Sequence, residues 1–378
     1  MAKDVPSYLG EQQKKTTGDV AQEFETFEEL YNKKLWHQLT LRLLEFVKHP
    51  SFSQGDGLIK LYNNFISDFE HRINPLALVE MCVFVVRQFK EIKDALDFLD
   101  SIKEKVKACE EAAVLALIIK GNIQLKEREM DATKEIVGEA QTILDNLDGV
   151  TPVHGRFYEL SSSYHKLMGN HAEYYREALR YLGCTTLDDI PSGEQLDRAF
   201  NLGLAALLGK GVYNFGELLA HPILNKLWET EKQWLVDLLY AFNSGNIGKF
   251  EELKSKWSTQ PDLKQHELLM RQKISLLCLM EMTFKRPATK RQLSFDEISK
   301  EAHLPVNEVE LLVMKALSLG LVKGSIDQVE KKVHMTWVQP RVLDREQIGV
   351  MQQKLEGWCT EVKDMESLVQ VRAQDILT

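Results

Sequence analysis

The sequence predicts a mainly α-helical protein: a long array of helical hairpins, then a small module that mixes helices and strands, then a long helix at the C-terminal end. Three observations predict this class. The 378 residues include only 21 glycines and 10 prolines, which is low for a turn-rich β protein. Apolar residues recur at helical spacing from about residue 26 to residue 284. After Phe284 this period changes, and short alternating segments take its place.

Composition excludes several classes of protein. Hydrophobic residues make up 44% of the chain and charged residues 27%, which is ordinary globular usage. The net charge of −9 repels nucleic acid and anionic lipid, so such binding would need a local basic patch. The longest apolar run, residues 112–119, is too short to cross a bilayer, and the N-terminus lacks the apolar stretch of a signal peptide. Five cysteines without close spacing indicate reduced thiols. We therefore expect a soluble intracellular protein.

Residues 1–22 are polar and aperiodic, which predicts a flexible N-terminal tail. Order is expected to begin near Thr26. Three helix starts are predicted from a Ser or Thr followed three positions later by Glu or Gln, a pattern in which the two side chains cap the helix reciprocally. These capping boxes are Thr26 with Glu29, Ser192 with Gln195, and Thr230 with Gln233.

Helical hairpins are indicated by two similar turns. Gly169-Asn170 and Gly245-Asn246 each separate two segments with apolar residues at helical spacing. The turns lie 76 positions apart, which corresponds to two repeats of about 38 residues. This period is typical of tetratricopeptide-like arrays, so residues 23–260 are predicted to form a helical-hairpin solenoid.

Residues 261–340 are predicted to form a winged-helix module with a leading helix. Residues 291–294 suit a short strand, and Ser294 with Glu297 forms a fourth capping box. A second helix is expected over residues 307–319, followed by strands at 321–326 and 332–338. Strand, helix, turn, helix and hairpin is the order of a winged helix.

The last predicted element is a helix from Arg345 to Arg372, within a C-terminal segment of residues 341–378. Its apolar residues alternate in steps of three and four, which is the heptad pattern of a helix that packs against another helix. The helix could fold back on the winged-helix module or pair with other chains, and the heptad regularity favours pairing with other chains. The heptad residues are Ile348, Met351, Leu355, Trp358, Val362, Met365 and Val369.

The second strand of the hairpin, residues 332–338, is predicted to be an exposed edge. An unpaired edge is a template for another chain, and this strand lacks the inward charges or proline that would prevent such pairing. Its alternating residues are Val333, Met335 and Trp337. The alternative is that these three side chains cover the helices of their own module.

No catalytic, cofactor or metal site is predicted. The zinc-protease motif needs a second histidine one helical turn after His266-Glu267, and Met270 stands there instead. The glycine-rich phosphate loops and the nucleophile elbow of hydrolases are absent from the sequence. The ten histidines are scattered singly, so none is a candidate ligand or base.

Nucleic-acid binding is a less favoured alternative for the winged helix, and a hidden enzyme is less favoured still. Basic pairs at Lys285-Arg286, Lys290-Arg291 and Lys331-Lys332 could contact phosphates, although a solvated loop explains them better. The helix that would enter a DNA groove offers a single basic residue on its outer face, where two carboxylates would repel the phosphates. That face carries Glu308, Glu310, Leu311, Met314 and Lys315.

The order of parts and several segments resemble the PCI-domain proteins, and in particular the PCI subunits of the proteasome lid. The resembling segments are GDGLIKLY at 55–62, FNSGN at 242–246, LLCLMEMTF at 276–284, NEVELLVMKAL at 307–317 and VHMTWVQPRVLD at 333–344. The resemblance covers nearly the whole chain and is tightest from residue 204 to residue 344. A subunit of a sister complex, the COP9 signalosome or translation initiation factor 3, is the alternative within the same family.

The resemblance implies a non-catalytic scaffold in the lid of the 26S proteasome regulatory particle, acting in ubiquitin-dependent protein degradation. The winged-helix edge, with Ile326, Val333, Met335 and Trp337, would face a neighbouring PCI subunit. The heptad residues would enter a bundle that organises lid assembly. Partners would be the other lid subunits, including the MPN-domain subunits, and not nucleic acid, membrane or a small molecule. Deubiquitination belongs to a zinc-dependent MPN subunit whose His-x-His motif this chain lacks. The expected location is the cytoplasm and the nucleus.

Overall fold

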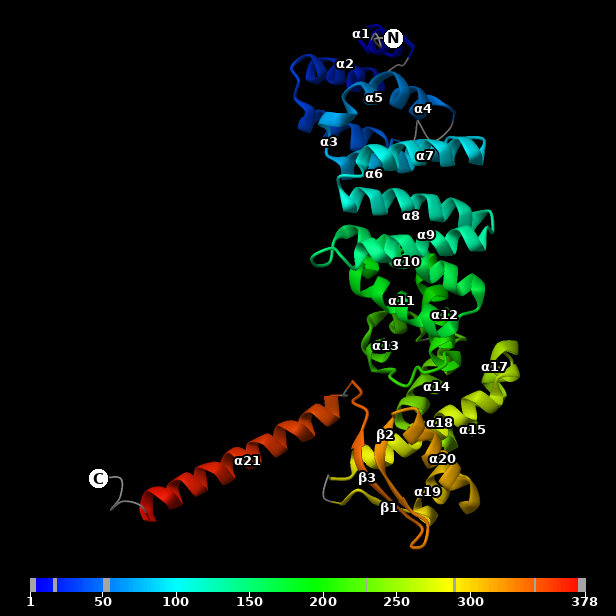
Figure 1. The fold of residues 1–378 in the computed structure, drawn as a ribbon, viewed down its shortest axis with the longest axis vertical. Coiled ribbons are helices and arrows are strands. Elements are labelled where there is room, and N and C mark those ends of the chain that lie inside the picture. The colour runs from blue at the N-terminus through cyan, green and yellow to red at the C-terminus, as the bar shows by residue number, and fades with distance from the viewer. Residues whose placement is uncertain are drawn as a thin grey trace. The chain divides into compact units, whose positions relative to one another are not determined.

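A computed structural model describes residues 5–15, 19–49, 55–228, 230–287, 290–342 and 345–372. These residues are mainly helical and include one three-stranded sheet, which confirms the predicted fold class (Figure 1). Internal contacts divide the chain into two compact units, one of residues Met1–Asn170 with Arg176–Thr186 and one of His171–Tyr175 with Leu187–Thr378. The division thus falls inside the span 23–260 that the sequence predicted as one solenoid, because the helices that follow residue 187 pack on the leading helix of the C-terminal module.

The first unit is built on helices that pack in sequence order. Helix α8 lies at its centre and contacts α6, α7, α9 and α10. Because neighbours surround it, the apolar run 112–119 is buried on every side. The elements are α1 Val5–Lys15, α2 Asp19–Asn32, α3 Trp36–Phe46, α4 Gly57–Leu61, η2 Tyr62–Ile66, α5 Ser67–Phe69, η3 Glu70–Arg72, α6 Pro75–Val86, α7 Ile92–Val106, α8 Glu110–Lys126, α9 Met130–Leu144, α10 Pro152–Met168 and α11 His171–Cys184, whose residues are shared between the two units.

The prediction of a flexible tail over residues 1–22 is wrong for the part that the structure describes. Residues 5–15 form α1, whose Val5 and Leu9 are buried. These two side chains lie one helical turn apart and join the core that contains Phe24 and Phe27 of α2. Two well-spaced apolar residues therefore dock a segment whose remaining residues are polar.

The two predicted glycine turns are confirmed. Gly169 and Gly245 end α10 and α14 in the left-handed conformation, with φ of 72° and 65°. Gly245 has a second reason to be glycine, since a Cβ there would lie 2.6 Å from the Cα of Cys278.

Three of the four predicted capping boxes are wrong. Thr26 lies inside α2 and donates to the carbonyl of Gln22, while Gln195 donates to the carbonyls of Leu187 and Ile190. Thr230 donates to the carbonyl of Leu227. The Ser294 box is confirmed: the Glu297 amide donates to Ser294 Oγ at 3.2 Å, and the Ser294 amide donates to the Glu297 carboxylate at 3.0 Å.

In the second unit, the long helix α18 is the common support. It contacts α12, α14, α15 and α17 on one part of its surface and α19, α20 and β3 on another. The elements before the sheet are η4 Leu187–Asp189, α12 Ser192–Leu208, α13 Gly216–Ala220, η5 Pro222–Leu227, α14 Gln233–Ser244, α15 Ile247–Glu252, α16 Lys254–Trp257, α17 Pro261–Gln265 and α18 Glu267–Lys285.

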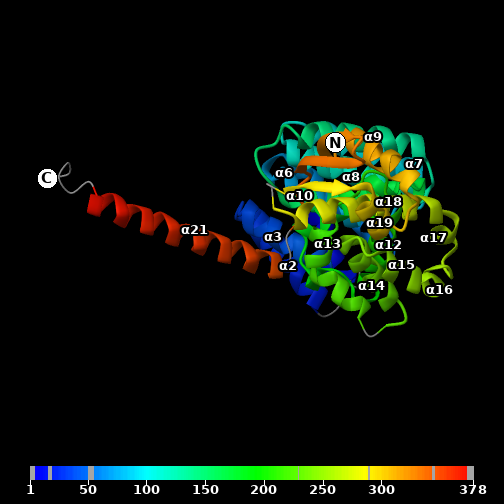
Figure 2. The ribbon, with the colours of Figure 1, turned by 90° about the horizontal axis from the view of Figure 1, so that it is seen from below.

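The winged-helix order is confirmed by β1 Gln292–Ser294, α19 Phe295–Ala302, α20 Val306–Ser318, β2 Val322–Asp327 and β3 Lys332–Val338. The sheet order is β1-β3-β2, with both pairings antiparallel, and Figure 2 shows the strands beside α18 and α19. The register shifts between Lys323 and Gly324. A Cβ on Gly324 would lie 2.2 Å from the His334 carbonyl oxygen, so the irregular pairing needs glycine there. The last element is α21 Arg345–Arg372, with the bounds that the heptad pattern predicted.

Candidate interaction surfaces

The heptad residues of α21 form one continuous exposed stripe, which we call the heptad seam: Ile348, Met351, Leu355, Trp358, Val362, Met365 and Val369. These seven side chains are 49–64% exposed. Large apolar side chains that recur at heptad spacing and stay open to solvent are typical of a helix that packs against another helix. The pairing of this seam with other chains stays a prediction.

The structure corrects the predicted winged-helix edge. Strand β3 lies in the middle of the sheet, hydrogen-bonded to β1 and to β2, and β2 is the longer outer strand. Val333 and Met335 point into the module and are buried, so the alternative reading holds for these two side chains. Ile326 is half-buried opposite Val333. Trp337 is 37% exposed, with the Lys323 ammonium 5.1 Å from its ring centre. Of the four predicted contact residues, only Ile326 and Trp337 offer side-chain surface to a partner.

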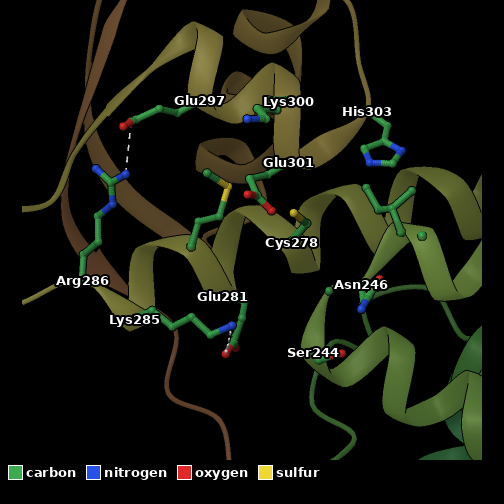
Figure 3. Close-up of a pocket in the computed structure, with 14 residues that line it drawn as sticks. Ser244, Asn246, Cys278, Glu281, Lys285, Arg286, Glu297, Lys300, Glu301 and His303 are labelled. Atoms are coloured by element: carbon green, nitrogen blue, oxygen red, sulfur yellow. Dashed lines mark ion pairs between the residues drawn. The ribbon is translucent and has the colours of Figure 1, made fainter.

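The basic pair Lys285-Arg286 faces acidic neighbours. It borders a pocket of about 730 Å³ between the turn after α14 and helices α18 and α19 (Figure 3). Arg286 pairs with Glu297 at 3.2 Å, and Lys285 pairs with Glu281 at 3.7 Å. Together with a backbone hydrogen bond from Ser294, Arg286 holds the pKa of the Glu297 carboxyl below its usual range. These pairs compensate charge that would otherwise be free to bind phosphate.

Helix α20 presents apolar and acidic side chains where a DNA-reading helix would present basic ones. Leu311 and Met314 are exposed, and the Glu310 carboxylate accepts from the Gln328 amide at 3.1 Å. Lys315 donates to Gln272 of α18 at 2.9 Å. This face suits contact with protein better than contact with a phosphate backbone.

His266 and Glu267, which form part of a zinc-protease motif in the sequence, both contact other residues in the structure. His266 Nδ1 lies 2.8 Å from the carbonyl of Asp262, and Glu267 is paired with Lys254. Across the described ranges, no cluster of three or more His, Cys, Asp or Glu side chains could hold a metal ion. No helix within those ranges is both long enough and apolar enough to span a bilayer.

Sequence reasoning missed one buried cation. Lys273 of α18 is 4% exposed, and its ammonium donates to the carbonyls of Ala206, Leu207 and Gly209 at 2.7, 3.1 and 2.9 Å. These carbonyls lie at the C-terminal end of α12, where the last carbonyls of a helix have no N–H group of the same helix to accept from. Burial lowers the pKa of Lys273 to about 7. The available signal was weak: Lys273 directly precedes the largely apolar run 274–280 but follows two other polar residues, Arg271 and Gln272.

Comparison with known proteins shows which family the chain belongs to. A family model described as PSD13 N-terminal repeats matches residues 23–239, and the PCI domain model matches residues 249–337. The chain is 39% identical to 26S proteasome non-ATPase regulatory subunit 13 homolog B of Arabidopsis thaliana, over 97% of this chain and 98% of the relative. It is 37% identical to 26S proteasome non-ATPase regulatory subunit 13 of Dictyostelium discoideum over the full length of both. The chain belongs to the family of 26S proteasome non-ATPase regulatory subunit 13.

Membership in the subunit 13 family confirms the resemblance to PCI-domain subunits of the proteasome. A sister-complex protein, eukaryotic translation initiation factor 3 subunit M of Coccidioides immitis, is only 24% identical over 51% of the chain. The match to the subunit 13 family extends through both the N-terminal repeats and the PCI domain. The observed winged helix lies within the residues matched by the PCI model.

Proposed function

We propose that this chain is a non-catalytic structural subunit of the lid of the 26S proteasome regulatory particle, and that it acts in ubiquitin-dependent degradation by holding other lid subunits in place. The observation that carries the proposal is the full-length match to regulatory subunit 13. The heptad seam supports it, because an apolar stripe along α21 needs a partner helix to leave water.

The expected partners are neighbouring PCI subunits and MPN-domain subunits. The heptad seam would enter a bundle of their helices, and the outer strand β2 with Ile326 and Trp337 would face an adjacent PCI module. The proposal that the chain is non-catalytic rests on its sequence, which carries none of the hydrolase, phosphate-loop or zinc-protease motifs. We also propose that the protein resides in the cytoplasm and the nucleus, which imaging of a fluorescently tagged chain would test.

Native sizing of the tagged chain from cell extract tests the proposal. The full-length chain is compared with a version that stops after Asp344, and the large fractions are identified by mass spectrometry. We expect the full-length chain in a megadalton fraction with proteasome subunits, and loss of that fraction on truncation. Co-migration with signalosome or initiation-factor subunits would support the sister-complex alternative, and a monomer that carries nucleic acid would overturn the proposal.

A pair of substitutions tests the heptad seam itself. Trp358→Asp with Val362→Asp places two charges in the seam, so we expect loss of incorporation with an unchanged far-ultraviolet circular dichroism spectrum. The matched control is Thr360→Asp with Ser367→Asp, on the opposite side of the same helix, which should incorporate normally. Normal incorporation of the seam variant would exclude the seam as the assembly contact.

A further inference from the structure

A second exposed apolar surface lies between α18 and α20 of the C-terminal module. It is a groove of about 400 Å³, which we call the α18–α20 groove. Leu276 and Leu312 form its buried floor, and the half-buried Leu304 also lines it. Leu268 and Leu311 line it at its lips and are 77% and 64% exposed. Leucine side chains that are this exposed and lie next to a buried apolar floor indicate a surface that contacts another molecule.

The groove is made by one face of each helix. On α18 it is lined by residues 268, 271, 272, 275 and 276, and on α20 by residues 308, 311, 312 and 315. Both sets have the spacing of residues that share a helix face. Lys315 of α20 donates to Gln272 of α18 at 2.9 Å, which joins the two helices across the groove. A valley between two packed helices accepts a third helix, whose side chains fit between their ridges.

The charges along the groove differ between its ends. Arg271 and Lys315 lie toward one end, and Glu308 lies about two helical turns from Lys315 along α20. Arg271 is paired with Glu251 at 3.2 Å, but Lys315 bonds only the neutral amide of Gln272. Among the described residues, neither Lys315 nor Glu308 forms an ion pair, so both charges are available to a partner.

We propose that the α18–α20 groove binds an amphipathic helix of another regulatory-particle subunit. The apolar face of that helix lies between Leu268 and Leu311, an acidic side chain faces Lys315, and a basic side chain faces Glu308. The inference rests on the proposed function, and it adds a contact separate from the heptad seam and from strand β2. Nucleic acid does not fit the groove, because its lips are leucines. Among the described residues that line it, the one cation without an ion pair, Lys315, is balanced by a carboxylate without an ion pair, Glu308.

Site-specific photo-crosslinking in the assembled particle tests this inference. A photoreactive amino acid replaces Leu268 or Leu311 in the full-length chain, and the control position is Leu41 of α3, which is also exposed. We expect crosslinks to residues of one other subunit that are spaced three, four and seven apart, as on one face of a helix. Crosslinks to a second copy of this chain, to nucleic acid or to an irregular loop would overturn the inference, as would a yield no higher than at Leu41.

Substitutions give an independent readout of the same contact. Leu311→Asp should lower the crosslinking yield from position 268 about tenfold, whereas Met314→Asp, also exposed on α20 but outside the groove lining, should leave it unchanged. Lys315→Glu should lower the yield, and a charge reversal at the crosslinked partner's acidic residue should restore it. A yield unaffected by Leu311→Asp would refute the groove. If the unsubstituted chain does not enter the particle, the proposed function fails; if it enters with the groove uncovered, only this inference fails.

Discussion

Lys273→Met removes a buried ammonium and keeps a side chain of similar length and apolar stem. In the wild-type chain this ammonium donates to the carbonyls of Ala206, Leu207 and Gly209 and lies 5.2 Å from the ring centre of Phe215. It therefore links α18 to the C-terminal end of α12 at a place that water does not reach. The two helices lie more than 60 residues apart in the sequence, so the link fixes tertiary structure.

The expected loss of stability follows from those contacts. A buried carbonyl that loses its donor costs about 1–3 kcal/mol, so three of them cost about 6 kcal/mol. Removing the ammonium returns part of this, because the charge no longer has to be desolvated on folding, which costs several kcal/mol. We expect Lys273→Met to lower the free energy of unfolding by about 3 kcal/mol at pH 7. Lys264→Met, at an exposed site on α17, should change it by no more than about 0.5 kcal/mol.

The difference in stability between wild type and Lys273→Met should also depend on pH. The pKa of Lys273 falls from 10.5 to about 7 on folding, so between these values the unfolded chain keeps a proton that the folded chain has lost. Wild-type stability therefore rises with pH across this window, by up to about 1.4 kcal/mol per pH unit, while the variant has no such group. Urea unfolding of both chains at pH 7 and pH 9 measures the difference. Equal stability of the two chains at both pH values would refute the link between α18 and α12, and a constant difference would refute the lowered pKa.

Further substitutions test the local physics of the fold. Gly245→Ala should destabilise the protein more than Gly169→Ala, since both glycines have positive φ but only Gly245 lies against the backbone of another segment. The midpoint temperatures of thermal unfolding compare the two variants. Equal decreases in midpoint temperature would contradict the close approach of Gly245 to Cys278. Leu9→Asp should release α1, seen as faster amide exchange over residues 5–15, whereas exchange like that of wild type would show that α1 is not docked through Leu9. Ser294→Ala should cost about 1 kcal/mol by removing the cap of α19. The Ser294 amide, which mainly lowers the pKa of Glu297 in the fold, is kept in Ser294→Ala, so the Glu297 charge is tested by the companion variant Glu297→Gln. Its cost should be present near neutral pH and decline as pH falls through the acid range, which urea unfolding at pH 7 and pH 4 measures; a pH-independent cost would exclude the Glu297 charge from the cap.

Local sequence determined several features of the elements correctly. The Ser294 capping box, the left-handed glycines at 169 and 245, and the bounds of α21 all follow from interactions within a few residues. The same locality explains the errors. A Thr followed by Glu three positions later can also occur inside a helix. Thr26 is an example, because its hydroxyl donates to the carbonyl of Gln22 in the preceding turn of α2.

Tertiary structure decided what those elements touch. Periodicity shows that Val333 and Met335 share one face of a strand, but strand β3 is central only because β1, about forty residues earlier, pairs with its free side. Nothing near Lys273 in the sequence indicates that its acceptors are the last carbonyls of α12. The α18–α20 groove likewise exists only because two helices separated by α19 and β1 pack against each other. A sequence period fixes which side of an element is apolar, whereas the partner of that side depends on the path of the whole chain.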